Sequence, residues 1–165
     1  MRQNNQAGID LIKHFEGLRL HTYRCSAGIL TIGYGCTNPK YAIIGNTITE
    51  QQAEQLLRND LVNAQRSVAR LISVPLTDNQ YAALVSFVFN LGGGALQRST
   101  LRQRINRGDY NVANEFGKWC YAGGKKLKGL QLRRQAEADL WNAQPRVASP
   151  SLAFYKWPDI PEQQN

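Results

Sequence analysis

The sequence predicts a predominantly helical α+β fold with two lobes. Two observations favour it. A short N-terminal segment and most of the chain after residue 49 carry apolar residues at helical spacing, whereas residues 18–35 alternate with the period of two that is typical of a strand. At 165 residues and 42% hydrophobic composition, the chain is long enough for one compact domain with a sizeable core.

The first expected helix covers residues 4–15, where apolar residues cluster towards one face. Glu16 falls at its end, directly before Gly17, a residue at which helices commonly stop. Because the C-terminus of a helix is the negative end of its dipole, this position favours the protonated form of a carboxyl group. A general acid that works near neutral pH needs that form.

A small β-lobe is expected over residues of about 17–48. Ser26-Ala27-Gly28 supplies a turn within the alternating segment, and the resulting hairpin brings Cys25 and Thr31 into one neighbourhood. Residues 36–48, which are punctuated by Asn, Pro and Gly, predict a third strand or a loop that closes this lobe.

A long connecting helix is predicted over residues of about 50–73. It begins at a capping box formed by Thr49 and Gln52 and ends before Pro75. A helix of this length measures roughly 35 Å at about 1.5 Å per residue, which is enough to connect two lobes.

We expect the rest of the chain, from residue 74 to 143, to form a helical lobe that packs with the N-terminal helix. Gly-rich segments separate its predicted helices, which cover residues 81–90, 100–107, 109–122 and 130–143. A Pro-containing tail of irregular structure, residues 144–165, is expected to pack through Leu152, Phe154, Tyr155 and Trp157. The whole chain is thus predicted to be a single domain, residues 1–165.

The positive charge is concentrated in one part of the chain. The net charge is +8, and residues 98–134 hold ten Lys or Arg against only Asp109 and Glu115. Such a segment favours a polyanionic partner, namely nucleic acid, an anionic membrane surface or an acidic cell-wall polymer. A basic face that only promotes solubility is the alternative.

Three cysteines, an odd number without metal-ligand spacing, predict reduced thiols and neither a disulfide framework nor a metal site. The N-terminal segment has the pattern of neither a signal peptide nor a membrane span. We therefore expect synthesis in a cytosol without stable membrane insertion.

Glu16, Cys25 and Thr31 are the candidate catalytic residues. No other acid lies between Glu16 and Glu50, so the local partners of this carboxyl group must be a thiol and a hydroxyl. His21 suggests a Cys/His pair as an alternative, but on a strand its side chain would lie about 13 Å from Cys25. Taken singly, each of these residues is more often a surface or packing residue.

The spacing carries more information than the residues alone. Eight residues separate Glu16 from Cys25, and five separate Cys25 from Thr31. Together with the segment Leu-Thr-Ile-Gly-Tyr-Gly at 30–35, this pattern resembles the phage-type lysozymes, glycoside hydrolase family 24. Their pattern is Glu, eight residues, Asp or Cys, five residues, Thr. A second block, from Ala82 to Glu137, is similar to the C-terminal lobe of the same family, and the resemblance spans about residues 5–141.

The resemblance implies a lysozyme-like fold and a muramidase that cleaves the β-1,4 bond between N-acetylmuramic acid and N-acetylglucosamine by inversion, for host cell lysis by a phage. It makes Glu16 the general acid, places Cys25 where Asp is usual, and gives Thr31 the water-orienting position. Phe89, Asn90 and Trp119 occupy motif positions that imply substrate binding, although core packing is an alternative for the two aromatic residues. No metal or cofactor is implied.

The role of Cys25 stays open at this point. An ordinary thiol has a pKa of about 8.5 and is mostly neutral at pH 7, so it acts as a base only if its surroundings lower that value. Arg24 and Arg19 are the candidates that lie nearby in sequence. Cys25 is therefore a thiolate base or electrostatic partner, a covalent nucleophile, or a thiol that positions water with Thr31; inversion favours the first or the third.

The expected partner is the glycan strand of bacterial peptidoglycan, bound by a monomer, with no nucleic acid involved. The resemblance also implies synthesis in the host cytoplasm and release by a separate pore-forming holin, so that the enzyme acts on the cell wall in the periplasm. Two rival interpretations are a nucleic-acid-binding domain that uses residues 98–134 and a non-catalytic cell-wall-binding domain.

Overall fold

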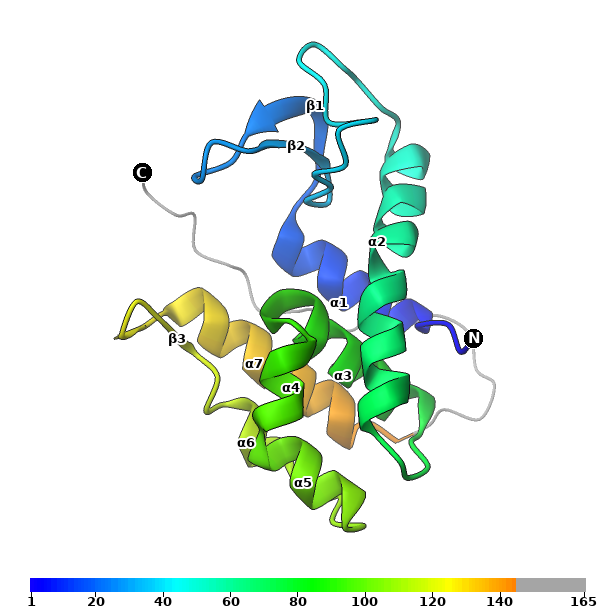
Figure 1. Cartoon of the computed structure of the whole chain (residues 1–165), viewed down its shortest axis with the longest axis vertical. Coiled ribbons are helices and arrows are strands. Elements are labelled where there is room, and N and C mark those ends of the chain that lie inside the picture. Colours follow the sequence, from blue (N-terminus) through cyan, green and yellow to red (C-terminus); the bar gives the residue numbers. More distant parts are fainter. Residues whose placement is uncertain (145–165) are drawn as a thin grey trace. The chain divides into compact units, whose positions relative to one another are not determined.

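The computed structural model describes residues 1–144, and the predictions for the tail lie outside this range. The chain is mostly helical with two small antiparallel hairpins, which confirms the predicted α+β class (Figure 1). The elements are α1 (Gln6–Glu16), β1 (Arg19–Arg24), β2 (Leu30–Gly33), α2 (Glu50–Leu71), α3 (Asp78–Leu91), α4 (Gly93–Arg98), α5 (Thr100–Asn106), α6 (Ala113–Phe116), β3 (Tyr121–Ala122), β4 (Lys125–Lys126) and α7 (Lys128–Asn142).

The chain divides into two compact units. The hairpin unit is Ile12–Asn63, and the helical unit combines Met1–Leu11 with the described residues from Ala64 onward. Both α1 and α2 contribute residues to each unit. The single domain and the lobe boundaries inferred from the sequence stay predictions.

In the hairpin unit, two glycines with positive φ set the path of the chain around β1. Gly17 (φ 72°) donates its N–H to the Lys13 carbonyl at 3.0 Å, which ends α1 directly after Glu16. Gly28 (φ 76°) donates to the Cys25 carbonyl at 2.8 Å and closes the turn between β1 and β2. The strands then pair so that Thr31 lies opposite Tyr23.

The segment from Cys36 to Ile48 is a loop, the second of the two predicted alternatives. Its backbone pairs with the hairpin at the isolated bridges His21↔Thr47 and Ile32↔Cys36. The start of α2 has the predicted capping box, in which the amides and side chains of Thr49 and Gln52 bond reciprocally at 2.8 and 3.1 Å. The buried apolar side chains of this unit are those of Ile12, Ile32, Tyr34, Cys36, Ala42, Ile48, Ala53, Leu56, Leu57 and Leu61.

The helical unit is organised around α3, which is apolar on all sides and buried from Tyr81 to Val88. Its N-terminus has the predicted capping box, with Thr77 as the N-cap and Gln80 at the third position. The start of α1 lies very close to α3, because a Cβ added at Gly8 would be 2.7 Å from the Cβ of Ala82. Only glycine allows the two helices to approach so closely.

A buried ionic cluster joins α7 to α3. The Arg134 and Glu137 side chains are fully buried, and Nε of Arg134 lies 2.7 Å from Oε2 of Glu137. Ser86 of α3 donates its hydroxyl to Oε1 of Glu137 at 2.7 Å. Arg134 in turn donates to Oδ1 of Asn90 at 2.9 Å, near the end of α3. One acidic side chain of α7 is thereby tied to both an arginine and the neighbouring helix.

One prediction for this unit was wrong, and one helix was missed. Residues 109–122 were expected to form one helix, but only Ala113–Phe116 is helical, and the chain then forms the β3–β4 hairpin. Gly123 (φ 57°) and Gly124 (φ 76°) both have positive φ, as a two-residue hairpin turn requires. The predicted stop of the preceding helix is confirmed at Gly92, but the helix α4, which begins at Gly93, was not predicted.

Among residues 1–144, none of the helices combines the length and the apolar character that crossing a membrane requires.

We predict that Glu137→Gln lowers the free energy of unfolding by about 3–5 kcal/mol, because it leaves Arg134 buried without its counter-charge. Urea denaturation followed by circular dichroism measures this change. Glu50→Gln removes an exposed carboxylate at the start of α2 and is the matched control, with an expected change within about 0.5 kcal/mol. Equal stability of the two variants would contradict the structural role of the cluster.

Candidate active site

Glu16 is the last residue of α1 and is partly exposed. Its carboxylate lies against the backbone just after β2, since a Cβ added at Gly35 would be 3.4 Å from Oε2 of Glu16. Gly35 has a φ of 89°, a conformation that favours glycine. The end of α1 and the end of the hairpin thus meet at this carboxylate, both within the hairpin unit.

The hairpin brings Cys25 and Thr31 together, as the sequence predicted. Cys25 directly follows β1, where its N–H donates to the Ile29 carbonyl at 2.9 Å. Because Thr31 pairs with Tyr23, two residues before Cys25, the Cys25 and Thr31 side chains lie on the same face of the hairpin. Cys25 is partly exposed, whereas Thr31 is 4% exposed.

The turn lowers the pKa of the Cys25 thiol below its ordinary value. The backbone amide of Ile29 contributes most and that of Ala27 next, because an N–H directed at sulfur stabilises the thiolate. The Thr31 hydroxyl adds a smaller contribution, and the partial burial of the sulfur acts in the opposite direction. Cys25 therefore ionises more readily than a free cysteine.

The Thr31 hydroxyl lies between two acceptors. It donates its proton to the Ile29 carbonyl at 3.0 Å and also contacts the Cys25 sulfur. A hydroxyl has one proton and two acceptor lone pairs. With a neutral thiol, Thr31 accepts from sulfur and donates to Ile29, whereas with a thiolate the proton of Thr31 turns towards sulfur. Either protonation state of Cys25 is accommodated without moving the backbone.

The arginines that the sequence suggested do not lower this pKa. Arg24 donates to the Gly28 carbonyl at 2.9 Å, and the guanidinium of Arg19 lies over the Tyr23 ring at 4.9 Å. His21 likewise forms no pair with Cys25, because its Nδ1 lies 2.8 Å from the Thr47 hydroxyl. Backbone amides, and not these side chains, lower the pKa of Cys25. The sequence did not predict this role of the amides, although it did predict the Ser26-Ala27-Gly28 turn that positions them.

The predicted substrate residues lie in the helical unit. Asn90 accepts a hydrogen bond from the buried Arg134, which fixes Oδ1 and directs its amide group. Trp119 packs edge-to-face on Phe87 at 5.7 Å, and Arg98 lies 5.5 Å above its ring. Phe89 is partly exposed at the end of α3. Substrate binding by these three residues stays a prediction.

No group of His, Cys, Asp or Glu within residues 1–144 has an arrangement that suits a metal ion.

Residues 13–137 match the family model described as Phage lysozyme. An endolysin from Acyrthosiphon pisum secondary endosymbiont phage 1 is 46% identical over 144 residues, which cover 84% of this chain and 97% of that protein. A SAR-endolysin from bacteriophage PS119 is 41% identical over 132 residues, 78% of each chain.

Two solved structures share the fold. A crystal structure of a mutant of P22 lysozyme has a TM-score of 0.81 and 37% identity, covering 87% of this chain and 100% of that one. The muramidase domain of SpmX from Asticaccaulis excentricus has a TM-score of 0.79 and 36% identity, again covering 87% and 100%.

The chain belongs to the phage lysozyme family. It is a peptidoglycan hydrolase that serves host cell lysis by a phage, and the predicted lysozyme-like enzyme is confirmed over the rival binding domains.

We predict that the alkylation rate of Cys25 by iodoacetamide rises with pH through a midpoint below that of the cysteine in an unstructured peptide, because the turn amides favour the thiolate. Mass spectrometry of the labelled peptide at successive pH values measures the midpoint. Cys36 and Cys120 are each 2% exposed and are expected to react slowly, and Cys25→Ser provides the background. A midpoint at or above that of the unstructured peptide would contradict the proposed environment.

Proposed function

We propose that Glu16, Cys25 and Thr31 hydrolyse the β-1,4 bond between N-acetylmuramic acid and N-acetylglucosamine with inversion at the anomeric carbon. The observation that carries this proposal is the lowered pKa of Cys25, which rests on the Ile29 and Ala27 amides and on Thr31. A thiol with these partners ionises more readily than a free thiol, and its thiolate supplies the negative charge that the family's usual carboxylate would carry.

Glu16 acts as the general acid. Its carboxyl group transfers a proton to the glycosidic oxygen as the bond to the anomeric carbon breaks and the sugar ring gains oxocarbenium character. The position of Glu16 at the end of α1, where the backbone at Gly35 approaches its carboxyl group, supports this role. The approach of Gly35 confines the carboxyl group on one side.

Cys25 and Thr31 act on the water. The Thr31 oxygen, which keeps a lone pair free when its proton turns towards the Cys25 thiolate, accepts a hydrogen bond from water and orients it. The Cys25 thiolate takes one proton from this water as the oxygen bonds to the anomeric carbon. After one turnover Glu16 is ionised and Cys25 is protonated, and exchange with solvent restores both.

Two other roles of Cys25 give different outcomes. A covalent nucleophile would form a thioglycosyl intermediate and retain the anomeric configuration, whereas inversion needs space for water between acid and base. A neutral thiol that only positions water gives inversion without dependence on the thiolate. The lowered pKa favours the base over this third role.

The helical unit is proposed to bind the glycan. Asn90 presents an amide group whose orientation is set by Arg134, and Trp119 presents an indole ring that is suited to stacking on a sugar. Phe89 adds apolar contact area. We further propose that the enzyme acts as a monomer in the periplasm after synthesis in the host cytoplasm, and that its release depends on a holin.

We predict that Glu16→Gln lowers lysis of cell walls by at least about 100-fold, because the amide has no proton to donate to the leaving oxygen. A turbidity assay on isolated walls measures the rate, and mass analysis of the released muropeptides identifies the bond. Glu50→Gln is the control for the loss of one carboxylate. Wall lysis at the native rate by folded Glu16→Gln would refute the assignment.

Cys25→Asp is expected to keep lytic activity, since an aspartate restores a negative charge at the same position, whereas Cys25→Ala is expected to lose about 100-fold. Bulky thiol reagents should inhibit the native enzyme and leave Cys25→Asp unaffected. Early-time analysis of the product anomers distinguishes the two roles of Cys25, because a base gives inversion and a covalent nucleophile gives retention. Full activity of Cys25→Ala would show that the thiol is dispensable.

A further inference from the structure

We propose that the pocket between α6, β4 and α7 binds a phosphoester. It encloses about 200 Å³ in the helical unit and is remote in sequence from Glu16, Cys25 and Thr31. This volume is far above the roughly 10–15 Å³ that a single water requires. The pocket is lined by Ala113, Asn114, Gly117, Lys126, Gln131, Arg134, Gln135 and Ala138.

The lining residues carry positive charge and amide groups but no acid. Lys126 and Arg134 supply the charge, and Asn114 and Gln131 supply amide N–H donors. The amide of Gln135 already donates to Oδ1 of Asp139 at 2.8 Å. The acid nearest in sequence to Arg134, Glu137, is already engaged by the Ser86 hydroxyl and by Arg134 itself. Such a lining suits an anion rather than a cation or an apolar molecule.

Arg134 provides the second and independent observation. Its side chain is fully buried, yet Nη1 has no hydrogen-bond partner. Nη2 is engaged by Asn90 and Glu137, and the guanidinium also lies over the Phe87 ring at 5.2 Å. A buried N–H without an acceptor is costly, and an oxyanion in the pocket would supply that acceptor.

Lys126 provides a route for the anion. It lies on β4, is exposed, and within residues 1–144 its ammonium group makes no ion pair or hydrogen bond. An ammonium group on a flexible stem can move aside to admit a ligand to Arg134 and then pair with it. The Gly123-Gly124 turn is what places β4, and therefore Lys126, at the rim of this pocket.

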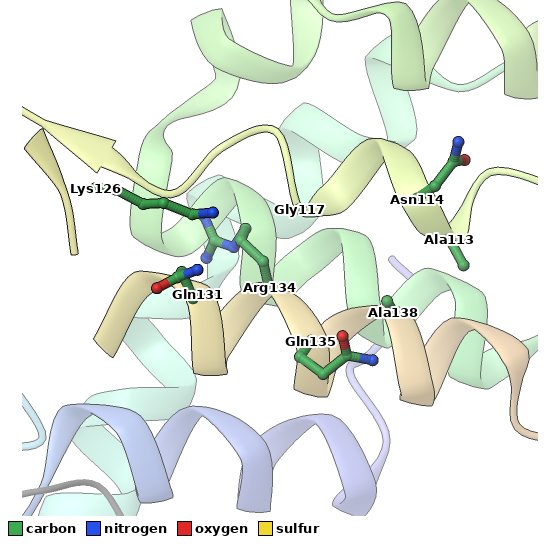
Figure 2. A pocket seen from close by; sticks show the side chains of 8 residues that line it. All are labelled: Ala113, Asn114, Gly117, Lys126, Gln131, Arg134, Gln135 and Ala138. Carbon is green, nitrogen blue, oxygen red and sulfur yellow. The ribbon is translucent and has the colours of Figure 1, made fainter. Parts of the chain in front are cut away.

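The two ends of the pocket differ in chemistry, and this difference limits the chemical class of ligand that fits. Figure 2 shows Lys126, Gln131 and Arg134 together at one end, and Ala113, Asn114 and Ala138 at the other. The donors at the cationic end come from both a strand and a helix, and they suit the several oxygens of a tetrahedral phosphate better than the two of a carboxylate. The small residues and the amide at the other end leave room for a short polar group, such as glycerol, that is esterified to the phosphate.

Titration calorimetry of the full chain with inorganic phosphate, with chloride maintaining the ionic strength, tests the site. One saturable event per chain is expected. Lys126→Gln should weaken phosphate binding about tenfold, the equivalent of one charge-assisted hydrogen bond. Lys125→Gln is the matched control, since it removes the same charge from the same strand outside the pocket and should change binding less than about twofold.

Two further arms distinguish the source of the anion. Glycerol phosphate should bind at least as tightly as phosphate, and Asn114→Ala should weaken glycerol phosphate but not phosphate. Acetate should bind more weakly than either. The proposal is overturned if binding does not saturate, if Lys125→Gln and Lys126→Gln weaken it equally, or if acetate binds best. The readout is binding alone, so it is independent of whether Glu16 and Cys25 are catalytic.

Discussion

The turn from Cys25 to Gly28 is the constraint on which the proposed chemistry depends. The hydrogen bond from the Gly28 N–H to the Cys25 carbonyl folds the chain back within four residues, and the positive φ of Gly28 allows it. The same geometry directs the amides of Ala27 and Ile29 at the Cys25 sulfur and places Thr31 on its face of the hairpin. A change in this turn would therefore alter the ionisation of Cys25 without touching its side chain.

A different interaction organises the helical unit. Glu137 accepts from Ser86 and pairs with Arg134, so α7 is joined to α3 by buried charge as well as by apolar contact. Arg134 then reaches both Asn90 and the pocket beside α6. One buried arginine thus connects the residue proposed to bind glycan with the proposed phosphoester site. A buried ion pair often stabilises a fold no better than apolar residues of the same volume would. We therefore connect the Arg134–Glu137 pair with ligand binding as well as with packing.

Sequence patterns predicted most elements of the fold because their signals are local. The capping boxes at Thr49 and Thr77, the stop at Gly17 and the hairpin turn before Gly28 each depend on a few adjacent residues, and the structure confirms all four. The failure between Asp109 and Gly124 has the opposite cause. Two consecutive glycines can either end a helix or form the turn of a hairpin. The positive φ of both Gly123 and Gly124 shows that here they form a hairpin turn.

The sequence by itself determined the family and the order of acid, thiol and hydroxyl, because the spacing of Glu16, Cys25 and Thr31 is a property of the chain alone. Only the tertiary structure decided what surrounds Cys25. Charge near in sequence pointed to Arg19 and Arg24, but their side chains engage an aromatic ring and a carbonyl. Backbone amides perform that role instead. Every residue except proline carries one, so no sequence pattern marks which of them will face a sulfur atom.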